Sequence, residues 1–354
     1  PTNLMTTTPL LFFTRWITHF CAPAFVFLSG ISAYLMGQRK TKGELSRFLM
    51  KRGCWLILVE IGIVTLGWTY DPLYHVLILQ VIWAIGVSMI ILALFVWLPV
   101  NVILICGFVI ICFHNLLDYQ EVSMNGRIGI FWDLVHHGNF AIVRFGPNHI
   151  LLIVYAFLPW TGIMLTGYGI GRIFTTNFAS ADRRKILFIV GSVLILLFFI
   201  LRSINHYGDP VHWYLQDTQF FSWLSFINLT KYPPSLDYIA LTVGVGMITL
   251  GLFDGIANRS LSFVRVFGRV PFFYYVIHIY LIHALAIILF LVQGYPAKDI
   301  KPQTSPFLFR PDNFGFGLLG VYLIWFGVIL ILYPVCQWYD RYKTTHSKWW
   351  LSYF

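Results

Sequence analysis

Long apolar runs separated by shorter polar segments dominate this chain of 354 residues. A helix needs about 20 residues, at about 1.5 Å per residue, to cross the hydrocarbon core of a bilayer. The runs therefore predict an all-α, polytopic transmembrane helix bundle, in which Pro99 separates the third helix from the fourth because proline cannot continue a helix. We expect nine spans, near 12–36, 53–70, 76–98, 100–117, 149–171, 186–201, 236–253, 270–293 and 314–337.

Two polar segments, 118–148 and 202–235, are longer than simple connections between helices. The second is rich in aromatic residues and contains three prolines, so its composition is not that of a flexible linker. Loops of this length in a compact protein are usually functional. We expect a single transmembrane domain over 1–354, with both segments on the extracytoplasmic side.

The positive charges alternate from one connection to the next. Sixteen of the 24 Lys and Arg residues lie in four connections, at 39–52, 172–185, 259–269 and 341–348, and eight lie elsewhere. The positive-inside rule makes the richer side cytoplasmic. We therefore expect a protein of the plasma (inner) membrane with a cytoplasmic C-terminus and an extracytoplasmic residue 1.

The first residues show no secretory signal, because no basic region and no apolar core precede the first span. An extracytoplasmic start then predicts that one further N-terminal span precedes residue 1. A short translocated tail is the alternative.

Composition narrows the class of partner. Hydrophobic residues make up 58% of the chain and charged residues 11%, against roughly 25% charged residues in a soluble domain. The net charge of +10 does not indicate nucleic acid, since no basic run with interleaved aromatics lies outside the membrane flanks. The five cysteines lie in apolar segments without paired spacing, which predicts neither a metal site nor a disulfide framework. The bilayer is the predicted partner.

His278 and His283 lie in the otherwise apolar run 270–293. An ionisable residue inside a membrane is a functional-site candidate, and neutral imidazole can act as a general base near physiological pH. At about 100° per residue the two side chains point about 140° apart, so we do not expect one small site for both. The alternative is a hydrogen bond between helices that serves packing. His283 is the stronger candidate because it lies nearer the outer loops.

Two other spans carry ionisable residues. Arg15 and His19 lie one helical turn apart and could hold an anionic or carbonyl oxygen, although Arg15 could also extend to the interface. Glu60 is central in the second span and must be protonated or paired, either in a structural ion pair or in catalysis.

Two dense polar clusters, at 202–210 and 231–235, mark the outer ends of two predicted helices. Their cations could bind a charged group, and their aromatic rings could stack on sugar faces. The alternative is an interfacial aromatic belt with helix-start signals. The candidate substrate-binding residues are Arg15, Glu60, Arg202, Asn205, Asp209, Lys231, Tyr232 and Ser235.

These clusters belong to a set of short motifs that resembles bacterial proteins related to heparan-alpha-glucosaminide N-acetyltransferase. The motifs occur in matching order and cover essentially the whole chain. They are 13–30, which contains Arg15 and His19, then 158–162, Asn205-His206-Tyr207-Gly208-Asp209-Pro210, Lys231-Tyr232-Pro233-Pro234-Ser235-Leu236, His278-Ile279-Tyr280-Leu281-Ile282-His283 and 349–353.

The resemblance implies a transmembrane acyltransferase that passes an acetyl or other acyl group from cytosolic acyl-CoA to an extracytoplasmic sugar amine or hydroxyl. No His, Cys, Asp or Glu set in the sequence has metal-ligand spacing, so we expect no metal, and a homo-oligomer stays open. The first helix of the family bears an Asp-His pair whose histidine is inferred to be the base, and this chain starts after that position. We name His283, His278 and His19 as catalytic candidates on their own positions, without transferring that role to His19.

The resemblance also implies a cytoplasmic entrance for the phosphates of CoA, with the thioester reaching inward along Gln80 and Glu60. The positive-inside rule alone also explains basic residues there. The candidates are Arg39, Lys40, Arg47, Arg52, Arg183, Arg184, Arg265 and Arg269.

Two other classes fit the intramembrane His and Glu residues: a transporter or exporter of a small polar or lipid-linked solute, and a membrane scaffold. No inverted repeat is visible in the sequence, which weighs against the transporter. We further predict that His283 and Lys231 belong to one outward-opening site.

Overall fold

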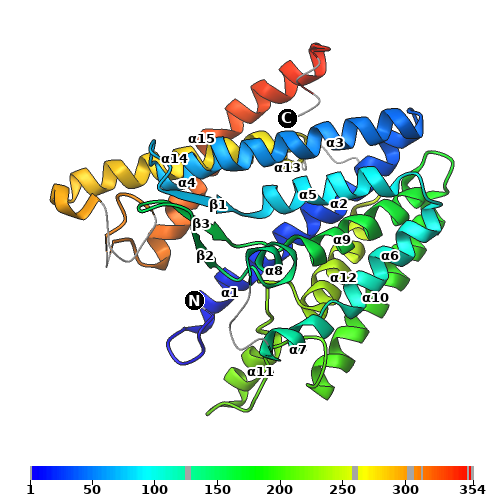
Figure 1. Ribbon diagram of the computed structural model, residues 1–354, viewed down its shortest axis with the longest axis horizontal. Coiled ribbons are helices and arrows are strands. Elements are labelled where there is room, and N and C mark those ends of the chain that lie inside the picture. Colours follow the sequence, from blue (N-terminus) through cyan, green and yellow to red (C-terminus); the bar gives the residue numbers. More distant parts are fainter. Residues whose placement is uncertain are drawn as a thin grey trace. The chain divides into compact units, whose positions relative to one another are not determined.

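The computed structural model describes residues 2–123, 129–256, 262–300, 307–311, 314–348 and 351. These residues are predominantly helical, with one small sheet (Figure 1). The chain forms two compact units, and the single domain predicted over 1–354 stays a prediction. Of the terminal motif 349–353, only Leu351 belongs to the described residues. Unit 1 comprises Pro1–Ile57, Leu79–Val143 and Ile153–Gly255, and unit 2 comprises Leu58–Ile78, Arg144–Leu152 and Ile256–Phe354.

Unit 1 contains most of the helices. Short 3₁₀ turns follow two of them, at Ile17–Phe20 and Gly171–Phe174, and a π-helical turn covers Asp133–His137. The helices are α1 (Pro9–Trp16), α2 (Cys21–Gly37), α3 (Lys42–Val59), α5 (Val81–Phe95), α6 (Val100–Phe113), α7 (Leu116–Ser123), α8 (Ile130–Trp132), α9 (Phe157–Ile170), α10 (Ser180–Ile204), α11 (Gln219–Ile227) and α12 (Leu236–Phe253).

Helix α9 is the centre of unit 1. It packs against α2, α5 and α6, while α10 pairs with α12 (Figure 1). Trp160 is fully buried, and the hydroxyl of Thr161 lies 3.0 Å from the hydroxyl of Ser88 on α5, which satisfies two polar groups in an apolar interior. The core of unit 1 is therefore built around one helix that contacts three others.

Two glycines allow α2 and α9 to touch through their backbones. A Cβ atom at Gly30 would overlap the carbonyl oxygen of Met164 and approach the nitrogen of Tyr168 to 2.7 Å. A Cβ atom at Gly167 would overlap the carbonyl oxygen of Phe27 and approach its carbonyl carbon to 3.0 Å. Small residues at such positions are typical of closely packed membrane helices.

Unit 2 contains α4 (Thr65–Thr69), α13 (Ser262–Arg269), α14 (Pro271–Val292) and α15 (Leu318–Thr345), with a π-helical turn at Glu60–Val64 and a 3₁₀ turn at Ala297–Ile300. Helix α14 packs against α4 and α15. A guanidinium nitrogen of Arg269 lies 3.1 Å from a carboxylate oxygen of Asp340, an ion pair between α13 and α15. The buried core beside this ion pair comprises Val266, Val270, Cys336, Tyr339 and Leu351.

Two predicted spans begin as strands, which corrects the sequence prediction. Strands β1 (Val76–Leu79), β2 (Ala141–Arg144) and β3 (Ile150–Ile153) form one sheet in the order β1-β3-β2. The predicted spans 76–98 and 149–171 thus contain β1 before α5 and β3 before α9. Hydrophobicity alone cannot separate a four-residue apolar strand from the start of an apolar helix.

The fold class agrees with the prediction of an all-α polytopic membrane protein. Five described segments are long and apolar enough to span a membrane: Pro9–Gly37, Ser180–Ile204, Leu236–Phe253, Pro271–Val292 and Leu318–Thr345. Helices α5 and α6 are shorter and equally apolar. The predicted span 53–70 is divided among α3, the π-helical turn and α4.

Candidate functional site

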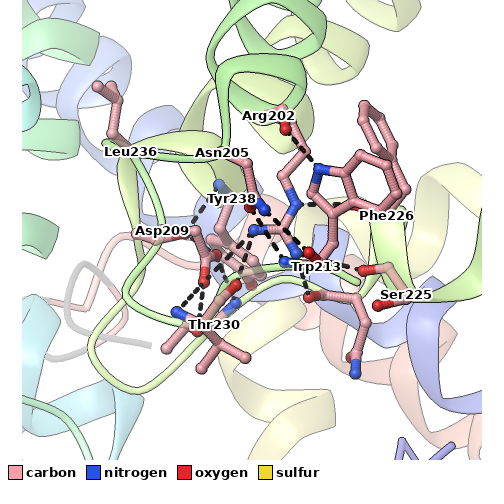
Figure 2. Close-up of polar contacts among 12 residues, drawn as sticks. Arg202, Asn205, Asp209, Trp213, Ser225, Phe226, Thr230, Leu236 and Tyr238 are labelled. Atoms are coloured by element: carbon pink, nitrogen blue, oxygen red, sulfur yellow. Dashed lines mark hydrogen bonds and ion pairs between the residues drawn. The ribbon is translucent and has the colours of Figure 1, made fainter. Parts of the chain in front are cut away.

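A buried ion pair organises the segment between α10 and α12 (Figure 2). Arg202 lies in the last turn of α10 with only 1% of its surface exposed. Its guanidinium donates to the carbonyl oxygens of Phe226 and Val211 at 2.9 Å, and to those of Ser225 and Asn228 at 3.2 Å. Every one of these acceptors is a backbone carbonyl, so Arg202 fixes the path of this segment.

Asp209 completes the same network. One of its carboxylate oxygens lies 3.8 Å from the guanidinium of Arg202. The carboxylate also accepts hydrogen bonds from the backbone N–H groups of Val211 and Thr230, each at 2.9 Å, and from the hydroxyls of Thr230 at 2.8 Å and Ser235 at 2.6 Å. We call Arg202, Asp209, Thr230 and Ser235 the Asp209 network. A buried carboxylate with this many donors anchors a loop.

Asn205 and Ser235 hold the two ends of the segment. Asn205 has left-handed backbone angles at the end of α10, and its side chain forms two hydrogen bonds with the backbone of Trp213, at 2.8 and 3.1 Å. The hydroxyl of Ser235 accepts a hydrogen bond from the N–H of Tyr238 and thereby caps the N-terminus of α12. Four of the predicted substrate-binding residues, Arg202, Asn205, Asp209 and Ser235, thus have partners within the loop.

The anchored loop presents Lys231 and Tyr232 to residues from distant parts of unit 1. The Tyr232 phenol forms hydrogen bonds with Tyr155 and Arg15, and Lys231 also hydrogen-bonds to it. The Tyr155 ring meets the Tyr232 ring edge-on at 5.2 Å, and Phe140 lies at the same distance. The Lys231 ammonium lies 5.4 Å from the centre of the Tyr232 ring. We call Arg15, Tyr155, Lys231 and Tyr232 the Tyr232 cluster.

The Tyr232 cluster has two cations and no acid. Among the described residues, neither Arg15 nor Lys231 forms an ion pair with a carboxylate. Burial lowers the pKa of Lys231, and Arg15 acts in the same direction. Burial would raise the pKa of Tyr232, but Lys231, Tyr155 and Arg15 outweigh it and lower that pKa. Such a cluster favours a negative charge, either on the phenol or on a bound group.

His19 lies beside this cluster and is buried, with 5% of its surface exposed. Its ring contacts the ring of Tyr238 at 5.4 Å, and its backbone carbonyl accepts a hydrogen bond of 2.6 Å from the Tyr238 hydroxyl. Lys231 and Arg15 are both close enough to act on His19 electrostatically. Sequence reasoning placed Arg15, His19, Lys231 and Tyr232 among the candidates, and the structure brings these four together.

A second polar site lies at the other end of α2. A cleft of about 860 Å³ contains the cations Arg39 and Lys40, which directly follow the helix. The cleft also presents hydroxyl and amide groups from both of the segments that form it. Its lining residues are Ser32, Leu35, Met36, Gln38, Arg39, Lys40, Phe174, Thr175, Thr176 and Asn177.

His278 and His283 line one pocket of about 400 Å³ in unit 2, together with Trp68 and Arg310. His278 Nδ1 hydrogen-bonds to the carbonyl of Tyr275, and His283 Nε2 lies 3.1 Å from the carbonyl of Leu308. The prediction concerned a single small site, which this wider pocket is not, so it stays a prediction. The residues between and beside the histidines on α14, among them Ile279, Ile282 and Ala286, also line the pocket.

The other predicted residues are distributed between the units. Glu60 is fully buried in the π-helical turn of unit 2. His283 belongs to unit 2 and Lys231 to unit 1, so the site predicted to contain both stays a prediction. No group of three or more His, Cys, Asp or Glu residues in the described ranges could hold a metal ion.

Sequence reasoning missed Tyr155 as a member of the cluster. Tyr155 lies in the apolar run that joins β3 to α9, where an aromatic residue is the expected core residue. No local signal could have indicated its contact with Tyr232. Tyr232 lies 77 residues later in the chain, and only the tertiary fold brings the two side chains together.

The apolar helices define an integral membrane protein, and unit 1 has a polar site at each end of helix α2. Comparison with known proteins makes the class specific. The sequence model described as "Heparan-alpha-glucosaminide N-acetyltransferase, catalytic" matches residues 3–187, which is more than half of the chain. The chain therefore belongs to this family of membrane acetyltransferases. Comparison with curated proteins and with solved structures gave no match.

Proposed function

We propose that this protein transfers an acetyl or other acyl group from cytosolic acyl-CoA to a sugar amine or hydroxyl on the extracytoplasmic side. The observation that supports this most is the presence of a polar site at each end of α2, a helix inside the region that the family model matches. The cationic cleft lies at one end and the Tyr232 cluster at the other. Transfer across a membrane needs one site for the donor and another for the acceptor.

The cleft suits the nucleotide end of acyl-CoA. CoA carries phosphates, which Arg and Lys bind through charge-assisted hydrogen bonds. Arg39 and Lys40 supply the charge, and Gln38, Thr175 and Asn177 supply neutral hydrogen-bonding groups. A volume of about 860 Å³ is within the usual range for a small-molecule site. Arg39 and Lys40 are two of the cations that the sequence named for the entrance.

The Tyr232 cluster suits the acceptor. Phenol and guanidinium groups hydrogen-bond to sugar hydroxyls, and the aromatic rings of Phe140 and Tyr155 lie next to Tyr232. Arg15 and Lys231 would stabilise the oxyanion that forms when the acceptor attacks the thioester carbonyl.

The distribution of basic residues supports the orientation that this transfer requires. Arg39 and Lys40 belong to the richer set of 16 Lys and Arg residues, so the cleft faces the cytoplasm. The Tyr232 cluster then faces the extracytoplasmic side of the inner membrane.

The test is acyl-CoA binding to the detergent-purified protein. Replacing both Arg39 and Lys40 by Gln should weaken the affinity for acetyl-CoA about 10- to 100-fold, because each charge-assisted contact contributes about 1.5–3 kcal/mol and substitutions at neighbouring groups are not additive. Binding of S-acetyl-pantetheine, which lacks the nucleotide, should be weak and should not respond to the substitutions.

Lys51→Gln is the matched control, since Lys51 is an exposed cation on α3 outside the cleft. Its affinity for acetyl-CoA should equal that of the unmodified protein. Radiolabelled acetyl-CoA with glucosamine in reconstituted vesicles then tests transfer itself. Absence of acyl-CoA binding at millimolar concentration would contradict the proposed function.

A further inference from the structure

The pocket of about 400 Å³ in unit 2 combines apolar walls with a single cation. Its walls come largely from α14 and α15, which pack against each other (Figure 1). Val321 and Ile324 of α15 line it together with one side of α14, and Arg310 lines it from the connection between the two helices. We call this pocket the Arg310 groove. It shares no residue with the Tyr232 cluster or with the cationic cleft of unit 1.

The apolar walls of the Arg310 groove are exposed where the chain crosses the membrane. Ile282, Phe316 and Val321 line the groove, yet 47%, 45% and 44% of their surfaces remain exposed. Helices α14 and α15 are both long and apolar enough to span a bilayer, and few of their residues are buried by protein. Apolar side chains exposed on a membrane-spanning helix contact lipid chains. The groove is therefore accessible from the bilayer.

The length of the groove matches one leaflet of a bilayer. His278 and Leu289 are the first and last residues of α14 that line it, and eleven positions separate them. At about 1.5 Å per residue, the groove extends about 16 Å along the helix. The hydrocarbon core is about 30 Å thick, so the chains of one leaflet extend about 15 Å. One acyl chain therefore fits the groove lengthwise.

The fold holds the segment that carries Arg310. The backbone N–H of Leu308 donates to the carbonyl of Thr69 at the end of α4 at 3.3 Å, and the carbonyl of Leu308 lies 3.1 Å from His283 Nε2 on α14. The Arg310 guanidinium lies 5.3 Å from the centre of the Phe307 ring. Arg310 is exposed, and no carboxylate in the described part of the chain lies within ion-pair distance of it. Its charge is thus free to meet an anionic ligand.

We propose that the Arg310 groove binds one molecule of an anionic phospholipid, with an acyl chain along α14 and the headgroup phosphate on Arg310. A guanidinium binds phosphate oxygens through two parallel hydrogen bonds. The connection between two membrane-spanning helices lies at a membrane face, where headgroups also lie, and basic pockets between such helices bind anionic headgroups. Binding of this lipid is separate from acyl transfer and does not depend on the proposed function.

Native mass spectrometry of the detergent-purified full chain tests the headgroup contact. Phosphatidylglycerol should bind saturably, one molecule per chain, with about 10-fold higher affinity than phosphatidylcholine with the same acyl chains, because only the former has a net negative charge. Arg310→Gln should lower the affinity for phosphatidylglycerol about 10-fold. Lys298→Gln is the matched control, since Lys298 is an exposed cation of the same connection and does not line the groove. It should leave the affinity unchanged.

Ile282→Trp tests the contact with the acyl chain. The larger side chain should fill the groove and lower the affinity for phosphatidylglycerol, and because Ile282 is exposed it should leave thermal unfolding in detergent unchanged. Ile288→Trp is the control, since Ile288 is equally exposed on α14 and does not line the groove. In vesicles, phosphatidylglycerol with a diazirine in its acyl chain should label residues 278–289 and 321–324, and Arg310→Gln should reduce this labelling.

An affinity for phosphatidylglycerol that responds to neither Arg310→Gln nor Ile282→Trp in folded protein would overturn the proposal. Equal affinity for phosphatidylcholine would do the same, since it would indicate ordinary lipid contact without selection by charge. Ile282→Cys tests for a second copy of the chain in the groove. Disulfide-linked dimers that excess phosphatidylglycerol does not suppress would contradict the proposal, and suppression by this lipid would support it. None of these measurements requires acyl transfer, so failure of the proposed function would not alter their outcome.

Discussion

The Asp209 network and the Tyr232 cluster share the segment 230–235 and differ in how their charges are satisfied. In the Asp209 network, the guanidinium of Arg202 meets four backbone carbonyls and the carboxylate of Asp209, which itself accepts four further hydrogen bonds. In the Tyr232 cluster, Arg15 and Lys231 share a phenol and have no described carboxylate partner. Charges of the first kind stabilise a loop, and charges of the second kind remain available to a ligand.

The difference shows that polar density in a sequence does not by itself identify a site. Residues 202–210 and 231–235 are equally polar, and both were candidates for substrate binding. What separates them is the set of partners of the charged groups. In one region these partners are backbone groups, two hydroxyls and the opposite charge, and in the other they include a phenol. Three substitutions would test this difference: one in the Asp209 network, one in the Tyr232 cluster, and one of a residue that lies between the two.

The largest effect is expected from Asp209→Ala. The substitution removes the acceptor of four hydrogen bonds and leaves the buried guanidinium of Arg202 without its counter-charge. Removing one partner of a buried ion pair costs about 3–5 kcal/mol of folding free energy. Thermal unfolding in detergent should show a large loss of stability, whereas Asp217→Ala, an exposed carboxylate in the same segment, should not. Unchanged stability in Asp209→Ala would mean that the network does not anchor the loop.

A smaller effect, and one of a different kind, is expected from Arg15→Gln. Because Arg15 is partly exposed and has no carboxylate partner among the residues that the structure describes, its loss should leave thermal unfolding unchanged. Acyl transfer should fall about 10- to 100-fold, in proportion to the loss of one charge-assisted contact in the transition state. Arg15→Lys, which keeps the charge, should recover part of the rate. A variant that unfolds but retains its rate per folded molecule would place Arg15 with the structural residues.

The smallest effect is expected from Ser235→Ala, at the boundary between the two regions. Ser235 donates to Asp209 at 2.6 Å and caps α12 by accepting from the N–H of Tyr238. Loss of an N-cap costs about 1 kcal/mol, so the unfolding midpoint should fall slightly. Ser29→Ala, which removes a hydroxyl bonded within its own helix, is the control and should be close to neutral. A loss as large as that of Asp209→Ala would show that the cap, and not the carboxylate, anchors the loop.

Hydrophobic patterning predicted the helices well because each helix must present an apolar surface to lipid or to its neighbours. Patterning failed at β1 and β3, where a run of four apolar residues precedes a helix. Such a run is too short to show whether its hydrophobic period is that of a strand or of a helix. Pro99 correctly marked the start of α6, and the predicted span 236–253 coincides with α12.

The candidate site was predictable only in part. Arg15, His19, Lys231 and Tyr232 were visible as polar residues near the ends of apolar spans. Their contact with one another could not be predicted, since Arg15 and Lys231 are separated by more than 200 residues and no local pattern encodes that contact. Tyr155 had no signal at all, because a tyrosine within an apolar run looks like a core residue.

The contact between α2 and α9 has a consequence for how an acyl group could travel. Gly30 and Gly167 bring the two backbones together without an intervening layer of side chains, so the helices cannot slide without colliding. The cleft and the Tyr232 cluster lie at the two ends of α2, whose 17 residues span about 25 Å. Under the proposed function, the flexible arm of the donor has to cover this length. The reach of that arm then becomes a criterion for which donors react.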